Sequence, residues 1–172
     1  MKQIFKNRYL KSFKFLSVHE VRTFINNQDV NRSLSIDETF GDYQYCYMCY
    51  NSLTSEKEFL IYFSSEEKEE DLNFLFWEDA HLFVIETGKN IYFIDQKELN
   101  IKVSFVLTTP LIGLYLTGRN NLVVLEEASY KLISKEGKVL SNEVFDLIED
   151  FSLSSNRLTI QTSEEKRTFE LL

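Results

Sequence analysis

Alternation of apolar and polar residues runs through the chain after residue 42 and predicts a long series of short β-strands. Two aromatic and β-branched runs, 43–50 and 58–63, flank a polar stretch and form an expected hairpin. Polar turns, several with a single glycine, separate the later runs. The further expected strands are 72–77, 82–86, 91–95, 101–107, 112–116, 122–126, 130–134, 139–144, 147–153, 158–162 and 169–172, with a helical turn as the alternative for 145–151.

A segment near the N-terminus has the signature of a helix. Ser17 and Glu20 have the spacing of a capping box, and apolar residues follow on one helical face as far as Ile25. A short helix is therefore predicted from residue 17 to about 27, with a strand over 16–25 as the competing interpretation. Within a single β-rich domain, 1–172, we expect this helix and a polar, irregular segment over 31–42 to make up 1–42, and an antiparallel meander to follow over 43–172.

The strand-rich part of the sequence contains an internal repeat. Leu82 aligns with Leu122 at a distance of 122 − 82 = 40 residues, and Leu122 aligns with Leu158 at 158 − 122 = 36 residues. A period near 40 in β-rich text is typical of propeller blades, each of which is a small antiparallel sheet that needs a neighbour to bury its faces. Such blades usually number four to eight, so this chain is too short to close a ring alone.

Four arrangements fit this repeat: a sandwich or curled sheet of repeated meanders, an open stack of blade-like sheets, a fragment completed by oligomerisation, or a coincidence of strand spacing. The expected fold is mainly β, an antiparallel meander with blade-like repeats plus one short N-terminal helix. We favour a sandwich or partial barrel over an incomplete propeller-like stack, with the helix covering an edge or an end.

Composition narrows the class of protein. The chain has 172 residues, of which 44% are apolar, enough for one folded domain with a sizeable core. It carries 19 Lys and Arg against 27 Asp and Glu, so its formal net charge is 19 − 27 = −8. Nucleic-acid binding is not expected, because phosphate contacts need a clustered basic face. Neither a signal-peptide pattern nor an apolar stretch of bilayer length is present, which predicts a cytoplasmic protein without membrane attachment.

Residues that could carry catalysis are few. No nucleophile elbow, phosphate-binding glycine motif or HExxH motif occurs, and His19 and His81 are the only histidines, so we expect neither an enzyme nor a cofactor. General acid–base pairs could be drawn from neighbouring carboxylates, but adjacent residues of a strand face opposite sides, which leaves one of each pair in water. The three pairs are Asp37–Glu38, Glu126–Glu127 and Glu149–Asp150.

The two cysteines form a CxxC spacing. Cys46 and Cys49 lie in a tyrosine-rich run of β character, where residues three apart point to opposite faces. A zinc site would need two further ligands, and a redox pair would need a helix N-terminus. We therefore predict reduced structural thiols and no metal site, with redox or metal chemistry as the alternative.

Two features indicate a protein-binding surface. An acidic run between two expected strands is predicted to be a loop, either merely solubilising or presented to a basic partner, and Glu38, Asp42, Glu78 and Asp79 could extend its field. Alternate tyrosines of the first hairpin strand share one face, which either packs into the core or stays partly exposed beside the acidic run. The candidate partner-binding residues are Glu66, Glu67, Glu69, Glu70, Asp71, Tyr43, Tyr45 and Tyr47.

In size, acidity, β meander and the segments 66–71 and 43–50, the chain resembles the small bacterial immunity proteins of contact-dependent growth inhibition and other polymorphic toxin systems. The resemblance is one of style and matches no family motif. It implies a neutraliser that docks an acidic, tyrosine-bearing surface on a basic toxin domain such as a nuclease. The alternatives are a propeller-like interaction or scaffold module with another protein partner, and a β-cavity that binds or transforms a small ligand.

Overall fold

The structure is a computed structural model that describes residues 2–5, 7–36 and 41–171. These residues divide into two compact units. Unit 1 comprises residues 1–72 and 95–100, and unit 2 comprises residues 73–94 and 101–172. Each unit has its own sheets and its own hydrophobic cluster, and the described part of the chain has no helix long and apolar enough to cross a membrane.

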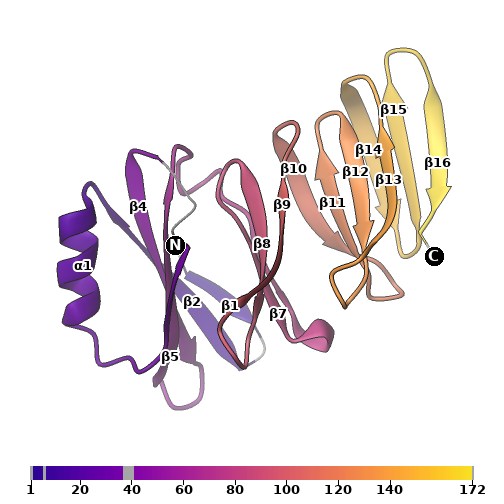
Figure 1. Cartoon of the computed structure of the whole chain (residues 1–172). Helices are drawn as coiled ribbons and strands as arrows, with labels where there is room; N and C mark the ends of the chain where they lie inside the picture. Colours follow the sequence, from indigo (N-terminus) through magenta and orange to yellow (C-terminus); the bar gives the residue numbers. More distant parts are fainter. Residues whose placement is uncertain (1, 6, 37–40, 172) are drawn as a thin grey trace. The chain divides into compact units, whose positions relative to one another are not determined.

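Unit 1 is a five-stranded sheet with a helix on one face, in the strand order β1-β2-β4-β5-β3 (Figure 1). Its central strand β4 pairs antiparallel with β2 and β5, whereas edge strand β3 pairs parallel with β5. Helix α1 packs Val21 against Cys46, Met48 and Leu60 of the sheet. The elements are β1 (Lys2–Phe5), β2 (Arg8–Phe15), α1 (Val18–Asn26), β3 (Ser33–Ile36), β4 (Tyr43–Asn51) and β5 (Lys57–Ser65).

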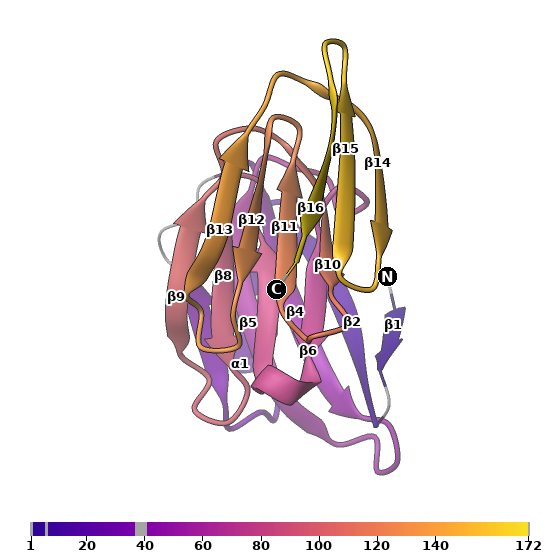
Figure 2. The same cartoon turned by 90° about the vertical axis from the view of Figure 1, so that its right-hand side faces the viewer.

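Unit 2 consists of three small antiparallel sheets that follow one another along the chain, from pink through orange to yellow in Figure 2. Within each of the sheets β6-β7-β8-β9, β10-β11-β12-β13 and β14-β15-β16, strands that are consecutive in sequence pair with each other. The elements are β6 (Phe74–Trp77), the short 3-10 helix η1 (Glu78–Ala80), β7 (Leu82–Glu86), β8 (Asn90–Asp95), β9 (Ile101–Val106), β10 (Leu111–Leu116), β11 (Leu122–Glu126), β12 (Ser129–Ile133), β13 (Val139–Val144), β14 (Ile148–Ser154), β15 (Arg157–Thr162) and β16 (Lys166–Glu170).

The sequence repeat is confirmed, because Leu82, Leu122 and Leu158 each begin or enter the second strand of a sheet. Strand β11 shows why the sheets stack. Its residues Leu122 and Val124 join a cluster with the first sheet, and the intervening Val123 and Leu125 join a cluster with the third. A strand buried on both faces must have a neighbour on each side. Unit 2 is thus an open stack of blade-like sheets, and the favoured sandwich or partial barrel was the wrong choice among the four arrangements.

A buried polar residue ends the second strand of each sheet and fixes the adjoining loops. Glu86 accepts hydrogen bonds from the amides of Asn73 (3.0 Å) and Gly88 (2.6 Å). Glu126, 40 residues later, accepts from the Thr108 amide at 2.5 Å and from its hydroxyl at 2.8 Å. Thr162, a further 36 residues on, accepts from the amides of two turn residues. The repeat therefore extends from the apolar strands to the polar groups that hold the loops.

The helix prediction is confirmed and the strand alternative is excluded. The Ser17 hydroxyl accepts a hydrogen bond from the Glu20 amide at 3.2 Å, and the Glu20 carboxylate accepts from the amide of Leu16 at 3.0 Å, one residue before the cap. The helical-turn alternative for 145–151 is also wrong, because strand β14 occupies most of that segment.

The description of 1–42 as a helix and an irregular segment was incomplete. Strands β1 and β2 precede the helix, and β3 lies within the segment expected to be irregular. Lysines interrupt the apolar positions of β2, and β3 is only four residues long, so each gives a weak local signal for a strand. Pairing with distant strands supplies what local sequence lacks, since β2 aligns with β4 from Arg8–Asn51 to Phe15–Gln44.

Candidate protein-binding surface

The acidic run forms a loop of unit 1, as predicted. It follows β5 directly and has no helix or strand over 66–71. Four of its carboxylate residues are exposed and Glu69 is half-buried. The exposed residues are Glu66, Glu67, Glu70 and Asp71.

Hydrogen bonds tie this loop to the sheet beneath it. The Tyr45 hydroxyl donates to the Glu67 carbonyl at 2.9 Å, and the Glu67 amide donates to the Ser65 hydroxyl at 3.0 Å. The Ser12 hydroxyl on β2 donates to the carboxylate of Glu69. Residues of β2, β4 and β5 therefore attach the acidic loop to the sheet and leave most of its carboxylates facing solvent.

The candidate tyrosines divide into one surface residue and two core residues. Tyr43 is half-buried, with the Lys14 ammonium 3.5 Å from the centre of its ring. Tyr45 and Tyr47 are 0% exposed, and both rings pack against Phe63, at 5.6 and 5.3 Å between centroids. Both faces of the central strand β4 are buried, so the expectation that Tyr45 and Tyr47 contact a partner is corrected in favour of core packing.

Tyr45 nevertheless links the two predicted features. Burial of the hydroxyl, followed by the negative charge of Glu69, the neighbouring Tyr43 and then Glu70 and Asp71, raises the pKa of Tyr45 to about 12. The phenol therefore stays protonated and remains a donor to the loop throughout the physiological pH range. Its role is to position the acidic loop from below.

The other acidic residues do not extend the loop in a demonstrable way. Asp42 is exposed just before β4. Glu78 and Asp79 lie in η1 of unit 2, and Glu38 falls outside the described residues, as does the pair Asp37–Glu38. The candidate surface is therefore the loop 66–71 together with Tyr43 at its base.

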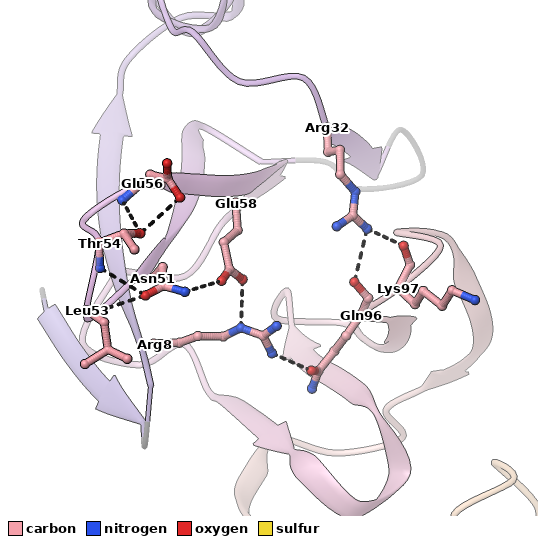
Figure 3. Close-up of polar contacts among 9 residues, drawn as sticks. All are labelled: Arg8, Arg32, Asn51, Leu53, Thr54, Glu56, Glu58, Gln96 and Lys97. Carbon is pink, nitrogen blue, oxygen red and sulfur yellow. Dashed lines mark hydrogen bonds and ion pairs between the residues drawn. The ribbon is translucent and has the colours of Figure 1, made fainter.

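A second polar cluster in unit 1 was not foreseen from the sequence (Figure 3). Arg8 donates to Glu58 at 2.7 Å and to the Gln96 side chain at 2.8 Å. Arg32 donates to the carbonyls of Gln96, at 3.1 Å, and of Lys97. The two arginines thereby hold the loop 96–100 that connects β8 to β9. The sequence gives no local signal for this cluster, because its charged residues are far apart in the chain and two of its acceptors are backbone carbonyls.

An open groove lies beside this cluster. It has a volume of about 510 Å³, and its lining includes Arg32, Lys57, Asp29, Glu56 and Glu58. Because charges of both signs face it, the groove suits a polar group and not the apolar ligand that the β-cavity hypothesis requires.

The cysteines lie in the core of unit 1. Cys46 and Cys49 are reduced and buried in β4, where burial raises the pKa of the Cys46 thiol to about 12. A thiol with so high a pKa is a poor nucleophile at neutral pH. No group of three or more His, Cys, Asp or Glu residues within the described ranges could hold a metal ion.

The remaining candidates for chemistry are surface or structural groups. His19 is exposed on α1, and His81 is exposed in a left-handed conformation (φ 52°) after η1. Glu127 is exposed beside the buried Glu126, so one carboxylate of this pair lies in water as expected. Glu149 and Asp150 are both exposed, so the expectation that they face opposite sides is wrong for that pair, where β14 has an irregular register.

No family model and no curated protein matches the chain. Solved structures do match. Dihydro-heme d1 dehydrogenase NirN, solved in complex with DHE, aligns with a TM-score of 0.54 and 12% identity over 75% of this chain and 32% of its own. Sqt1 of Saccharomyces cerevisiae aligns with a TM-score of 0.52 and 14% identity over 77% and 42% of the two chains. A eukaryotic initiation factor gives 0.51 and 15% over 73% and 34%.

The structural neighbours have WD40-like propeller folds. The fold of the present chain is propeller-like as well. The chain spans less than half the length of each of the three structures named above, and the identities are so low that the likeness concerns the fold alone. The blade-like period inferred from Leu82, Leu122 and Leu158 thus corresponds to a recognised architecture.

Proposed function

We propose that this protein is a propeller-like interaction module that binds a basic protein partner through the loop 66–71. The observation that carries the proposal is the anchoring of that loop: Tyr45 and Ser12 hold it while Glu66, Glu67, Glu70 and Asp71 stay exposed. A surface ordered before binding loses little conformational entropy on association, and a strongly net-negative cluster accelerates encounter with a basic partner.

The rest of the molecule supports a platform role. Stacked sheets with apolar faces buried between them form a stiff body, as the double-sided burial of β11 illustrates. The loop 66–71 is attached to the five-stranded sheet of unit 1, and binding through such an attached loop needs no chemical step. The whole protein therefore fits recognition better than turnover.

Neutralisation of a basic toxin domain is a narrower form of the same proposal. The formal net charge of −8 favours it, because a strongly acidic protein is attracted over distance to a basic nuclease. A scaffold role with another basic protein uses the same loop. The two differ in consequence: a neutraliser protects a cell that expresses its partner, and a scaffold does not.

The test begins with capture of the partner from cells of the source organism, followed by association kinetics with the purified partner. The loop variant reverses Glu66, Glu67, Glu69, Glu70 and Asp71 to lysine. Its association should slow about tenfold or more at low salt, and the wild-type rate should fall as ionic strength rises. An unchanged association rate in the loop variant would refute the proposal.

A matched control separates location from net charge. Five exposed carboxylates of unit 2 reversed to lysine change the formal charge equally, from −8 to −8 + 10 = +2. The association rate should fall less in the control than in the loop variant, because the control's substitutions lie outside the loop. Equal losses in the two variants would mean that net charge alone drives binding. The control residues are Glu127, Glu149, Asp150, Glu164 and Glu165.

A further inference from the structure

Strand β16 is a free edge with a regular backbone. It pairs antiparallel with β15 from Arg157–Glu170 to Gln161–Lys166 without a bulge, and no described strand lies on its other side. The Thr162 amide donates to the Glu165 carbonyl, so residues 165, 167 and 169 direct their N–H and C=O groups towards β15. By alternation, the backbone groups of Lys166, Thr168 and Glu170 point outward.

The face of this sheet is less suited to association than its edge. Cross-strand pairs of polar residues cover the side away from the apolar cluster: Arg157 with Glu170 at 2.8 Å, and Thr159 with Thr168 at 3.1 Å. A polar, internally bonded face gives a further sheet no apolar surface to bury. A strand added beside β16 does not need such an apolar surface, because backbone hydrogen bonds join it to the edge.

We infer that two copies of this chain associate by antiparallel pairing of their β16 strands about a twofold axis at Thr168. In this register Lys166 lies opposite Glu170 of the second copy, Glu170 lies opposite its Lys166, and Thr168 lies opposite its Thr168. All of these are outward-facing residues, so each opposed pair is a hydrogen-bonded pair. The sequence Lys-Arg-Thr-Phe-Glu is therefore complementary to itself in charge and in backbone geometry.

The opposite face of the strand is complementary as well. The same register sets Arg167 opposite Phe169 of the second copy. Within one chain, the Arg167 guanidinium lies 5.0 Å from the ring centre of Phe169, so this face of the strand already holds a cation beside an aromatic ring. The second copy adds a further contact of the same kind on each side of the axis.

The neighbouring sheets agree with a strand at this position. Both other sheets of unit 2 have a fourth strand, β9 or β13, beside the third, and the second copy's β16 takes the equivalent place beside β16. Across from that place, β13 presents Glu143, 3.6 Å from Arg167. A polar residue there suits an incoming strand that carries an arginine.

The test measures mass against concentration by sedimentation equilibrium of the whole protein, without any other partner. Wild type should double in mass as concentration rises. Lys166→Glu places like charges across the axis and should be monomeric, as should Glu170→Lys. An equimolar mixture of these two variants should dimerise again, because each glutamate then faces a lysine. A wild type that stays monomeric to about 1 mM, or a mixture that stays monomeric while wild type dimerises, overturns the inference.

A backbone variant tests the hydrogen-bonded edge directly. Thr168→Pro removes an outward N–H from each copy without removing a bond to β15, and should weaken dimerisation about 30-fold through two lost hydrogen bonds. Ser104→Pro is the matched control, since Ser104 occupies an outward position on edge strand β9 and should leave the dimer unchanged. Equal effects of the two prolines would contradict the assignment to β16. Strand β16 and the loop 66–71 share no residue, so failure of this test leaves the proposed function untouched.

Discussion

Replacing Glu126 by glutamine should destabilise unit 2 by about 3 kcal/mol at pH 7. The Glu126 side chain is 0% exposed and forms an ion pair with Lys131, whose side chain is 15% exposed. It also accepts from the Thr109 amide at 3.0 Å and from the Ser129 hydroxyl at 3.0 Å, in addition to both donors of Thr108. Glutamine has nearly the same shape as glutamate, but it lacks the negative charge to which these donors are bonded.

The magnitude follows from what the substitution leaves behind. Removing one member of a buried ion pair costs about 3–5 kcal/mol, because the other charge stays desolvated. Lys131 has some exposure and a flexible stem, so it can turn towards water and keep the cost near the lower limit. Glu127→Gln is the matched control, since this exposed neighbour should change stability by less than about 0.5 kcal/mol.

The pH dependence has a defined sign. Burial acts to raise the pKa of Glu126, but hydrogen bonds from Lys131, Thr109 and Thr108 outweigh it and hold the pKa below the ordinary 4.5. A depressed pKa contributes stability that is fully present above the unfolded value and is lost as pH falls through the folded value. The difference between wild type and Glu126→Gln should therefore stay constant from pH 7 to about pH 5 and shrink below pH 4.5.

Urea unfolding followed by Trp77 fluorescence is the appropriate assay. Trp77 is the single tryptophan and belongs to the cluster shared by the first two sheets of unit 2, so it reports on the sheet that contains Glu126. The midpoint should fall with little change in the slope of the transition. A loss below about 1 kcal/mol at pH 7, or a difference that grows on acidification, would refute the structural role assigned to this carboxylate.

Further predictions concern the loop, a turn and a thiol. Tyr45→Phe removes the donor to the Glu67 carbonyl, so amide exchange in the loop should accelerate about tenfold, and unchanged exchange would exclude the anchor. Gly137→Ala should destabilise unit 2 by about 1–2 kcal/mol in urea unfolding, because φ is +80° and the new Cβ would lie 2.9 Å from Val103; a neutral result would contradict this packing. Cys46 should resist iodoacetamide in the native protein at pH 8 and react on unfolding, since burial raises its pKa to about 12; rapid native alkylation, located by mass spectrometry, would contradict it.

The acidic loop could be predicted from the sequence, and its anchor could not. Five carboxylates within the six residues 66–71, with only Lys68 among them, repel one another in a regular strand, so a loop was expected there. Whether Tyr43, Tyr45 and Tyr47 face solvent depends on how many sheet faces are covered, and alternation alone cannot tell a strand with one buried face from a strand with two. For the same reason, the sequence did not predict that Tyr45 is buried and donates a hydrogen bond to the loop from below.

Local sequence determined the helix after Ser17 and the blade-like repeat, because a capping box and tight turns between neighbouring strands are interactions of residues close in the chain. Only the tertiary structure decided the strand pairings of unit 1 and the cluster in which Arg8 meets Gln96, 88 residues away. The self-complementary edge at β16 combines both kinds of information. The sequence gives the order of its residues. The pairing with β15 decides which of its backbone groups point outward. Contacts between distant segments form because together they bury apolar surface, and a short stretch of sequence does not show which distant segments will meet.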